Sequence, residues 1–467
     1  MTNFNFKFLG AWLVIVASIT GLQAQNDFTL KGKDEMVPAG VWNDVNGEYI
    51  NAHGGGILLF DSKYYWFGEH RPAKGFSTEV GVTCYSSTDL CNWRYEGVAL
   101  SVSEEAGNEI EKGCIMERPK VIYNKRTKKF VMWFHLELKG KGYEAARAGV
   151  AVSDSPTGPY RFVSSSRVCP GIFPLNMTEE ERDMQWNMEQ FEEWWTPEWR
   201  EAVNKGLFVK RDLEGGQMSR DMTLYVDDDG IAYHIYSSEE NLTLQIAELT
   251  DDYQGHSGKY VRLFPGGHNE APAIFKKDGT YWMITSGCTG WDPNVAELAV
   301  ADSIMGQWTT IGNPCTGPDA DKTFYAQSTY VQQVYGKGNA YIAMFDRWKK
   351  KNLEDSRYVW LPLEFGKDGT ITIPWRDSWD PRTQWEEQGD FSAGKGTFLL
   401  NGKPFVIKAA ELHYPRIPKA YWDQRIKLCK ALGMNTICLY VFWNSHESQP
   451  GAVSYTHLRA HETCADL

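Results

Sequence analysis

The sequence predicts an all-β fold, a five-bladed β-propeller, followed by the incomplete start of a β/α fold. Residues 268–287 contain two apolar runs rich in β-branched and aromatic residues, joined by Lys277, Asp278 and Gly279 as a hairpin turn. About four short antiparallel strands per repeat, repeated five times, is the content of a β-propeller. The other copies of the hairpin pattern, each followed by outer segments of strand character, lie at residues 56–69, 117–135, 219–238 and 326–347.

The N-terminal segment has the pattern of a secretory signal peptide. Lys7 precedes an apolar run at residues 8–22, and polar residues follow Ala24, after which we expect cleavage. The run is too short to span a membrane, and no other stretch is apolar enough to do so. We therefore expect residues 1–24 to be removed and the protein to be exported, to the periplasm or the extracellular medium.

Charge and aromatic content narrow the classes of partner. The chain of 467 residues has a formal net charge of −12, and no run of Lys and Arg alternates with aromatic residues, which argues against a nucleic-acid partner. Aromatic residues make up 14% of the chain, with 19 Trp, and flat apolar rings stack on the C–H faces of sugars. Packing within β-sheets also accounts for aromatic residues, so both interpretations stay open.

A polar residue stands at the head of each innermost predicted strand. In a propeller these strands run along the central channel, so equivalent positions in five blades converge on one shallow funnel. A β-sandwich, the competing all-β architecture, would not explain this recurrence. The five head residues are His53, Glu117, Asp221, Glu270 and Gln327.

Residues 177–204 interrupt the strand pattern with helical spacing. Thr178 and Glu181 have the spacing of a capping box, and Trp194, Trp195 and Trp199 follow. We expect a helical insertion between the second and third blades. Its tryptophans either wall one side of the site or pack the insertion against the propeller, because an amphipathic face must pack somewhere.

The pattern changes after the predicted propeller domain, which we assign to residues 26–375. Residues 376–395 form a predicted linker. A predicted buried strand at 405–410, an amphipathic helix at 421–432 and a second buried strand at 436–442 follow. This β-α-β order opens a parallel sheet or barrel, but a complete (β/α)8 barrel needs about 250 residues, so this one is incomplete.

Three of the head residues are carboxylates, the groups that hydrolysis of a glycosidic bond requires. One carboxylic acid protonates the departing oxygen, and a second group activates water or attacks carbon. Glu270 precedes an apolar strand, and low-dielectric surroundings and a neighbouring Asp221 carboxylate would raise its pKa. Arg220 could orient either carboxylate or a sugar hydroxyl, and Glu117 could accept two sugar hydroxyls. A single carboxylate of this kind is more often a surface strand end or half of an ion pair, but three at equivalent repeat positions favour a catalytic site.

Five short motifs carry a resemblance to glycoside hydrolase family 43. They are Ala52-His53-Gly54-Gly55-Gly56, Glu117-Arg118-Pro119-Lys120-Val121, Ser219-Arg220-Asp221-Met222, Glu270-Ala271-Pro272 and Thr289-Gly290-Trp291. The resemblance covers about residues 37–375. Within the family, the motifs resemble in particular those of the subgroup that contains exo-β-1,3-galactanases. It implies a five-bladed propeller that acts with inversion, with Glu270 as general acid and Asp221 tuning its pKa. We expect His53, Arg220 and Trp291 to bind the substrate.

The general base has no clear place in the sequence. Most members of the family carry an Asp in blade one, whereas residues 51–56 contain no carboxylate here. The exo-β-1,3-galactanase subgroup shares that lack, and a glutamine matching Gln327 is implicated there near the attacking water. Because a neutral amide is a poor base, we expect Gln327 to position the water while Glu117 or another group takes the proton.

Residues 396–451 resemble the opening of a glycoside hydrolase family 35 β-galactosidase, a (β/α)8 barrel. The resemblance rests on Leu400-Asn401-Gly402-Lys403-Pro404-Phe405, Glu411-Leu412-His413-Tyr414-Pro415-Arg416 and Tyr440-Val441-Phe442-Trp443-Asn444. The resemblance implies that Tyr440 matches a tyrosine that contacts galactose in that family. Residues matching both catalytic glutamates of that family are absent, so we expect this part to be inactive. Residues 452–467 resemble translated sequencing adapter, and we expect a non-native tail after a truncated barrel.

Together these observations predict an exo-acting, inverting glycosidase that releases galactose from β-1,3-galactan chains of arabinogalactan. α-L-Arabinofuranosidase or β-xylosidase activity on the same fold is an alternative, and a non-catalytic carbohydrate-binding propeller is an alternative of another class. No cofactor is required by this chemistry and no metal ligands are assigned. The carboxylate and amide oxygens of the funnel would nevertheless suit a structural Ca²⁺ ion.

Overall fold

The computed structural model describes residues 35–191, 193–385, 391–394, 396–400, 402–418 and 421–439. The predicted signal peptide at 1–24 and the predicted tail at 452–467 lie outside these residues. Among the helices that are described, none has the length and apolar character needed to cross a membrane.

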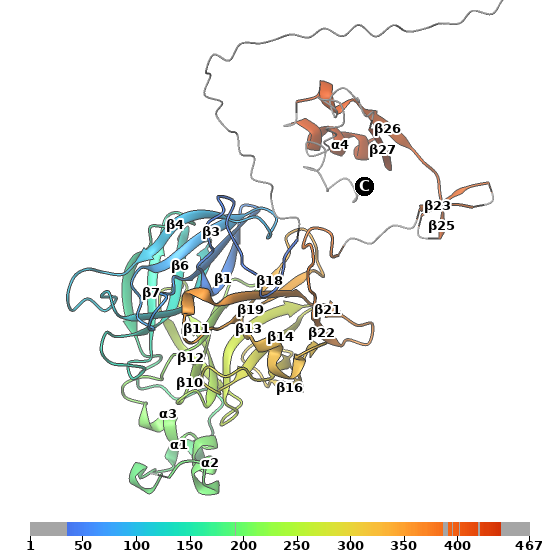
Figure 1. Cartoon of the computed structure of the whole chain (residues 1–467). Coiled ribbons are helices and arrows are strands. Elements are labelled where there is room, and N and C mark those ends of the chain that lie inside the picture. The colour runs from blue at the N-terminus through green and yellow to red at the C-terminus, as the bar shows by residue number, and fades with distance from the viewer. Residues whose placement is uncertain are drawn as a thin grey trace, which may run out of the picture. The chain divides into compact units, whose positions relative to one another are not determined.

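Residues 53–362 form five successive antiparallel sheets (Figure 1). Strands in each sheet neighbour one another in chain order, as the repeated hairpin pattern predicts. The sheets comprise β1 (His53–Phe60), β2 (Lys63–Glu69), β3 (Gly81–Ser87) and β4 (Arg94–Ser101); β5 (Ile115–Asn124), β6 (Lys129–Glu137), β7 (Arg147–Ser153) and β8 (Arg161–Ser166); β9 (Met222–Val226), β10 (Ala232–Ser238), β11 (Thr243–Leu249) and β12 (His256–Leu263); β13 (Asn269–Lys277), β14 (Thr280–Gly287), β15 (Ala296–Ala301) and β16 (Thr309–Gly312); and β18 (Gln327–Gln333), β19 (Tyr341–Arg347) and β20 (Arg357–Pro362). A smaller sheet contains β17 (Cys315–Thr316), β22 (Ile371–Pro374) and β21 (Glu364–Phe365).

The first strands of the five sheets form a closed ring. β1 contacts β5, β5 contacts β9, β9 contacts β13, β13 contacts β18, and β18 contacts β1 again. Segments before and after the ring also pair with each other, because Met36 bridges to Trp379 and the Ala39 N–H donates to the Tyr358 carbonyl at 2.7 Å. Antiparallel sheets repeated around a central ring are the architecture of a β-propeller.

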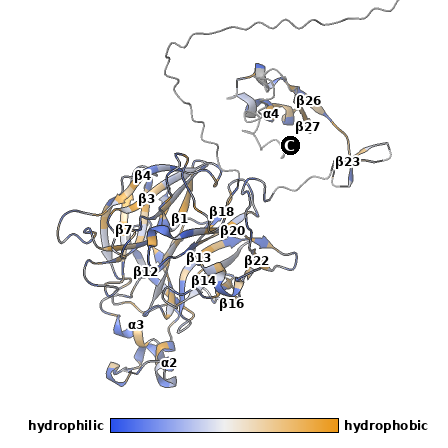
Figure 2. Ribbon diagram, viewed as in Figure 1, coloured by the Kyte–Doolittle hydropathy of each residue, from blue (hydrophilic) through white to orange (hydrophobic). Residues whose placement is uncertain are grey.

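Aromatic side chains fill the space between the first and last sheets. Trp66 lies with its ring centroid 4.7 Å from that of Trp360 and 5.3 Å from that of Trp93, and all three are buried. Trp42 packs edge-on against Trp66 and Trp360. Figure 2 shows hydrophobic residues recurring along the strands of the sheets. Each buried side chain of this size contributes about 1.5–3 kcal/mol, so these tryptophans stabilise the closure of the ring.

The same backbone irregularity recurs at the head of three inner strands. The pairing register shifts just after His53, Glu117 and Glu270. The residue that follows each of them is left-handed, with φ of 58°, 56° and 51° respectively. A bulge redirects the side chain beside it, so each head residue leaves the regular alternation of its strand. Only the first bulge requires glycine, because a Cβ on Gly54 would lie 2.1 Å from a carboxylate oxygen of Glu69.

Short helices occupy the connection between β8 and β9. They are α1 (Glu179–Asp183), η1 (Met188–Phe191), α2 (Pro197–Asn204) and α3 (Leu207–Arg211). The predicted capping box is confirmed, because the Glu181 N–H donates to the Thr178 hydroxyl and the Thr178 N–H donates to the Glu181 carboxylate. Trp199 is buried, as packing of the insertion requires, while Trp194 and Trp195 stay 41% and 49% exposed.

The residues from 391 onward form small elements of their own. β23 (Phe391–Ala393), β24 (Phe398–Leu400) and β25 (Lys403–Phe405) pair antiparallel, whereas β26 (Ala409–Leu412) and β27 (Thr436–Leu439) pair in parallel around α4 (Trp422–Ala431). The predicted β-α-β order is therefore present. The prediction of a buried first strand at residues 405–410 is wrong: Val406 and Ile407 are 70% and 40% exposed, and the strand β26 begins only at Ala409.

Candidate active site

Four of the five head residues meet around a cavity of about 220 Å³. Glu117 belongs to β5, Asp221 immediately precedes β9, Glu270 belongs to β13, and Gln327 begins β18. Two further predicted residues, Arg220 and Trp291, lie in the same wall. The complete lining is Arg71, Glu117, Arg118, His135, Tyr143, Arg220, Asp221, Asn241, Glu270, Gly290, Trp291, Gln327 and Trp348.

Glu270 stands in the surroundings of a carboxylic acid that keeps its proton. Its side chain is buried against the cavity wall, and only 9% of the residue is exposed. Burial, followed by the charge of Asp221, raises the pKa of Glu270 to about 8. A carboxyl group with that pKa is mostly protonated at neutral pH and can act as a general acid.

Arg118 fixes Asp221 beside the acid. Its Nε and Nη2 donate to the two carboxylate oxygens of Asp221 at 3.0 and 2.8 Å, a bidentate pair. Its Nη1 donates to the Ser328 carbonyl at 3.0 Å, and the guanidinium carbon lies 5.6 Å from the ring centroid of Trp348. Because Asp221 is held at both oxygens, its negative charge stays in place next to Glu270.

The side-chain amide of Gln327 is oriented by three neighbours. Its Oε1 accepts from Arg118 Nη2 and from Trp348 Nε1, the latter at 3.0 Å, and its Nε2 donates to Ser286 Oγ at 3.0 Å. Arg and Trp only donate, so the carbonyl must face them. One N–H of Gln327 is left to donate, and both acceptor positions of its oxygen are engaged. This geometry suits the predicted role of placing a water or a hydroxyl and excludes the amide oxygen as a proton acceptor.

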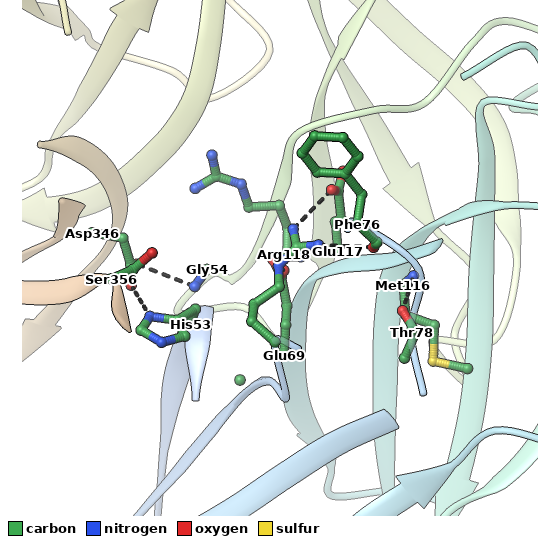
Figure 3. Close-up of polar contacts among 12 residues, drawn as sticks. His53, Gly54, Glu69, Phe76, Thr78, Met116, Glu117, Arg118, Asp346 and Ser356 are labelled. Carbon is green, nitrogen blue, oxygen red and sulfur yellow. Dashed lines mark hydrogen bonds and ion pairs between the residues drawn. The ribbon is translucent and has the colours of Figure 1, made fainter. Parts of the chain in front are cut away.

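Glu117 is held as an ionised carboxylate. Its Oε1 accepts from Arg71 Nη2 at 2.8 Å and from the Tyr143 hydroxyl at 2.9 Å, and its Oε2 lies 3.1 Å from His135 Nδ1 (Figure 3 shows Glu117 beside Arg118 and Glu69). Burial alone would raise the pKa of Glu117, but Arg71 and His135 outweigh it and hold that pKa well below its usual range. A carboxylate of such low basicity is a hydrogen-bond acceptor for sugar hydroxyls and a poor general base.

His53 does not contact the cavity, so its expected role in substrate binding is corrected. The residue is completely buried, and its Nδ1 lies 3.1 Å from Asp346 Oδ1, while the other oxygen of Asp346 accepts from the Gly54 N–H at 3.1 Å (Figure 3). Its ring stacks on Tyr358 at 4.8 Å between centroids. The bulge after His53 turns it toward the last sheet, where it helps to close the ring. Tyr440, the other expected substrate contact, lies outside the described residues.

Several site residues were missed because they are not head residues. His135 and Ser286 stand directly opposite Glu117 and Glu270 in the strand pairing. Cross-strand partners on one face touch, so counting back along each predicted hairpin from its turn would have found them. The same register places Glu69 opposite His53 and Asp346 opposite Gln327. Arg71, Tyr143, Asn241 and Trp348 lie beyond the ends of strands, where no sequence period marks them.

A second cavity of about 250 Å³ adjoins the first. The two share Gly290, Trp291, Gln327 and Trp348 in their linings, and Tyr325 belongs to the second. Two tryptophans thus stand where the cavities meet, and the indole of Trp291 is 6.0 Å from that of Trp348 between centroids. Trp194 and Trp195 line neither cavity.

The interior beneath the site is occupied by the side-chain amino group of Lys120, whose pKa is lowered to about 7 by burial. Lys120 is buried, and its Nζ donates to the carbonyl oxygens of Gly54 at 2.9 Å and Arg118 at 3.3 Å. Those oxygens would otherwise be suitable ligands for a cation such as Ca²⁺. Within the described part of the chain, no group of three or more His, Cys, Asp or Glu residues is placed to hold a metal ion.

Two family models match the sequence. Glycosyl hydrolases family 43 matches residues 182–371. Glycosyl hydrolases family 35 matches residues 397–461, so this match continues past residue 451, where we expected the resemblance to end. β-Galactosidases of Xanthomonas manihotis and Mus musculus are 42% and 44% identical to this chain over 59 residues, which is 13% of this chain and 10% and 9% of theirs. The chain therefore spans about a tenth of the length of the curated relatives it matches.

Solved structures resemble the propeller part. A GH43 β-1,3-galactosidase determined with galactodeoxynojirimycin is 68% identical, with a TM-score of 0.73, over 74% of this chain and 100% of its own. An exo-β-1,3-galactanase from Clostridium thermocellum is 34% identical, with a TM-score of 0.60, over 75% of this chain and 67% of its own. An exo-β-1,3-galactanase from Phanerochaete chrysosporium determined with β-1,3-galactotriose is 31% identical, with a TM-score of 0.58, over 74% and 68%. Since the first of these similarities spans the whole of the solved chain, this protein belongs to glycosyl hydrolase family 43.

Proposed function

We propose that this protein is an exo-acting, inverting glycosidase that releases galactose from the ends of β-1,3-galactan chains, such as those of arabinogalactan. The observation that carries the proposal is the buried carboxyl group of Glu270 in the cavity wall beside Asp221, whose two carboxylate oxygens are held by Arg118. The similar solved structures are a β-1,3-galactosidase and exo-β-1,3-galactanases, and these activities suggest the sugar and the linkage. We further propose that each of the five sheets is one propeller blade and that residues 1–24 direct export.

The proposed reaction assigns the proton donor to Glu270. It protonates the departing glycosidic oxygen, and the nearby Asp221 charge keeps its pKa high enough for it to hold a proton at neutral pH. Gln327 donates its remaining N–H to the attacking water or to a sugar hydroxyl, and the attacking water loses its proton to solvent as its oxygen bonds to the anomeric carbon. Glu117 accepts hydroxyl groups of the bound sugar. A retaining mechanism would need a free carboxylate nucleophile, but Asp221 and Glu117 are each held by an arginine and other donors, which favours inversion.

The size of the site supports removal of one sugar at a time. The first cavity, at about 220 Å³, falls below the roughly 300–1,000 Å³ of pockets for drug-sized ligands, and so suits a single sugar unit. The adjoining second cavity, entered past Trp291 and Trp348, would take the next unit of the chain. Aromatic rings at that junction can stack on the C–H face of a pyranose.

The test is hydrolysis by the full chain of β-1,3-galactobiose, of β-1,3-galactotriose, and of aryl α-L-arabinofuranoside and aryl β-xyloside. We expect galactose from the first two, with the α-anomer appearing first by NMR. Glu270→Gln should abolish turnover, whereas Glu248→Gln on the outer strand β11 should leave it intact. Release of arabinose or xylose alone would reject the galactan assignment. Binding of galactobiose without turnover by the wild type would support the carbohydrate-binding alternative.

A further inference from the structure

His135 links Glu117 to a second buried carboxylate behind the cavity wall. Its Nδ1 lies 3.1 Å from Glu117 Oε2, and its Nε2 lies 2.8 Å from Glu137 Oε1. His135 is 1% exposed and Glu137 is fully buried. The other oxygen of Glu137 accepts the Ala146 N–H at 2.9 Å. Ala146 has a left-handed φ of 45°, a conformation that a non-glycine residue keeps only where its surroundings hold the backbone in place.

Hydrogen bonding alone restricts the protonation state of His135. An ionised carboxylate only accepts, and a histidine donates from both ring nitrogens only when it is an imidazolium. A neutral ring would turn one nitrogen lone pair toward a carboxylate oxygen inside the protein. The arrangement is therefore satisfied when His135 carries a positive charge between two negative ones.

The surrounding charges fit this state. The charged and titratable groups that contact Glu117 or His135 are Arg71, Glu137 and Tyr143. Arg118 and Asp221 line the same cavity, and Glu69 contacts Arg71. Arg71 is shared between Glu69 and Glu117, and Arg118 is engaged by Asp221. His135 is therefore the one cation among these groups placed to neutralise Glu137.

We propose that His135 is a positioning residue, an imidazolium which, anchored by Glu137, keeps Glu117 ionised and fixed as the acceptor of substrate hydroxyls. This inference rests on the proposed function of the cavity. His135 acts through Glu117 and touches no reacting atom.

The direction of the pKa shifts agrees with the geometry. Burial alone would lower the pKa of His135, but its bonds to Glu117 and Glu137 outweigh burial and raise that pKa to about 9. Arg71, followed by the contact with His135, outweighs burial and keeps the pKa of Glu117 well below its usual range. Glu117 should therefore stay ionised over the whole pH range in which the wild-type protein is folded and active.

The experiment replaces His135 with asparagine and measures kcat and KM on β-1,3-galactobiose from pH 4 to pH 9. Two buried carboxylates then face each other without the cation between them, and one must take up a proton at higher pH. We expect an acidic limb of kcat/KM to move upward by at least about one pH unit, and KM to rise roughly tenfold, as loss of a charged hydrogen bond implies, with a smaller change in kcat. Glu137→Gln removes one of the two carboxylates that raise the pKa of His135, so His135 should lose its charge at a lower pH than in the wild type.

His234→Asn is the matched control. His234, like His135, is a buried histidine on the second strand of its sheet. Its neighbours are His256, Trp133 and Tyr236 rather than carboxylates, and burial keeps its pKa well below its ordinary value. It should lose stability while its acidic limb and KM remain those of the wild type. An identical acidic limb in His135→Asn and the wild type would overturn the proposal.

A readout without substrate separates this inference from the proposed function. In the ¹⁵N-labelled wild-type protein at pH 7.5, both ring nitrogens of His135 should carry protons and show imidazolium shifts. The signal is assigned among the ten histidines by its absence in His135→Asn, or by its shift in Glu137→Gln if the first variant does not fold. A neutral ring at this pH would refute the proposal whatever the enzyme hydrolyses, whereas an imidazolium in a protein without galactosidase activity would reject the function alone.

Discussion

Glu270→Gln should separate the catalytic role of Glu270 from its cost to the fold. The pKa of Glu270 is raised from 4.5 to about 8 in the folded protein, because the carboxylate is buried and lies near the charge of Asp221. Between these two pH values the folded state binds more protons than the unfolded state. The stability of the wild type therefore falls as pH rises through this window.

The size of the effect follows from the shift. Each pKa unit corresponds to about 1.36 kcal/mol, so a shift of about 3.5 units makes ionised Glu270 cost about 5 kcal/mol above pH 8. Glutamine has nearly the same shape and no charge, so the variant avoids that cost. We expect Glu270→Gln to be inactive and as stable as the wild type near pH 4.5, yet several kcal/mol more stable than the wild type at pH 9.

Urea unfolding of both proteins at pH 4.5, 7 and 9 measures this difference. Glu248→Gln serves as control. Glu248 on β11 pairs with Lys259 on β12, and neither residue lines the cavity, so this variant should show no comparable gain at high pH. A difference between Glu270→Gln and the wild type that is the same at all three pH values would refute the burial of a protonated Glu270. Loss of activity alone would not show that Glu270 is protonated in the folded protein.

Three further predictions concern the charge pair, the first bulge and the chain boundary. Asp221→Asn removes the second cause of the raised pKa of Glu270, so the alkaline limb of kcat/KM should move down by roughly one pH unit or more, and an unmoved limb in the pH profile would exclude this coupling. Gly54→Ala should lower the free energy of unfolding in urea by at least about 1–3 kcal/mol, because the left-handed backbone and the Glu69 carboxylate leave no room for a Cβ; an unchanged urea midpoint would contradict the geometry. A chain ending at residue 388 should keep the melting temperature and galactobiose activity of the full chain, since the ring closes through Met36 and Trp379 before that point, and failure to fold would disprove this boundary.

The sequence predicts the parts of this molecule that local repetition determines. The repeated hairpin pattern locates the five sheets. Glu117, Asp221, Glu270 and Gln327 lie around one cavity because each stands at the start of an inner strand. His53 also heads an inner strand but does not line the cavity. Its partner Asp346 lies 293 residues away in the sequence, and only closure of the ring brings the two together. No local pattern carries a contact of that sequence separation.

The site residues beyond the heads divide into two kinds. Glu69, His135, Ser286 and Asp346 stand opposite head residues, so strand register could have identified them from sequence. Arg71 and Trp348 lie in connections, where neither period nor register constrains the side chain. Their roles follow only from the three-dimensional arrangement, in which Arg71 pairs with Glu117, and Trp348 donates to Gln327 and stacks near Arg118.

Glu117 and Glu270 show why an equivalent repeat position does not determine a chemical role. Both follow the same backbone design: a strand head, a register shift and a left-handed next residue. Both are also buried, which by itself raises the pKa of a carboxyl group. Glu117 faces the cations Arg71 and His135, so its pKa falls, whereas Glu270 faces Asp221, whose own cation Arg118 is already engaged, so its pKa rises. The repeat therefore supplies two similarly placed carboxylates. The cross-strand and loop residues lower the pKa of one and raise that of the other, which is the difference that the proposed role of Glu270 as proton donor requires.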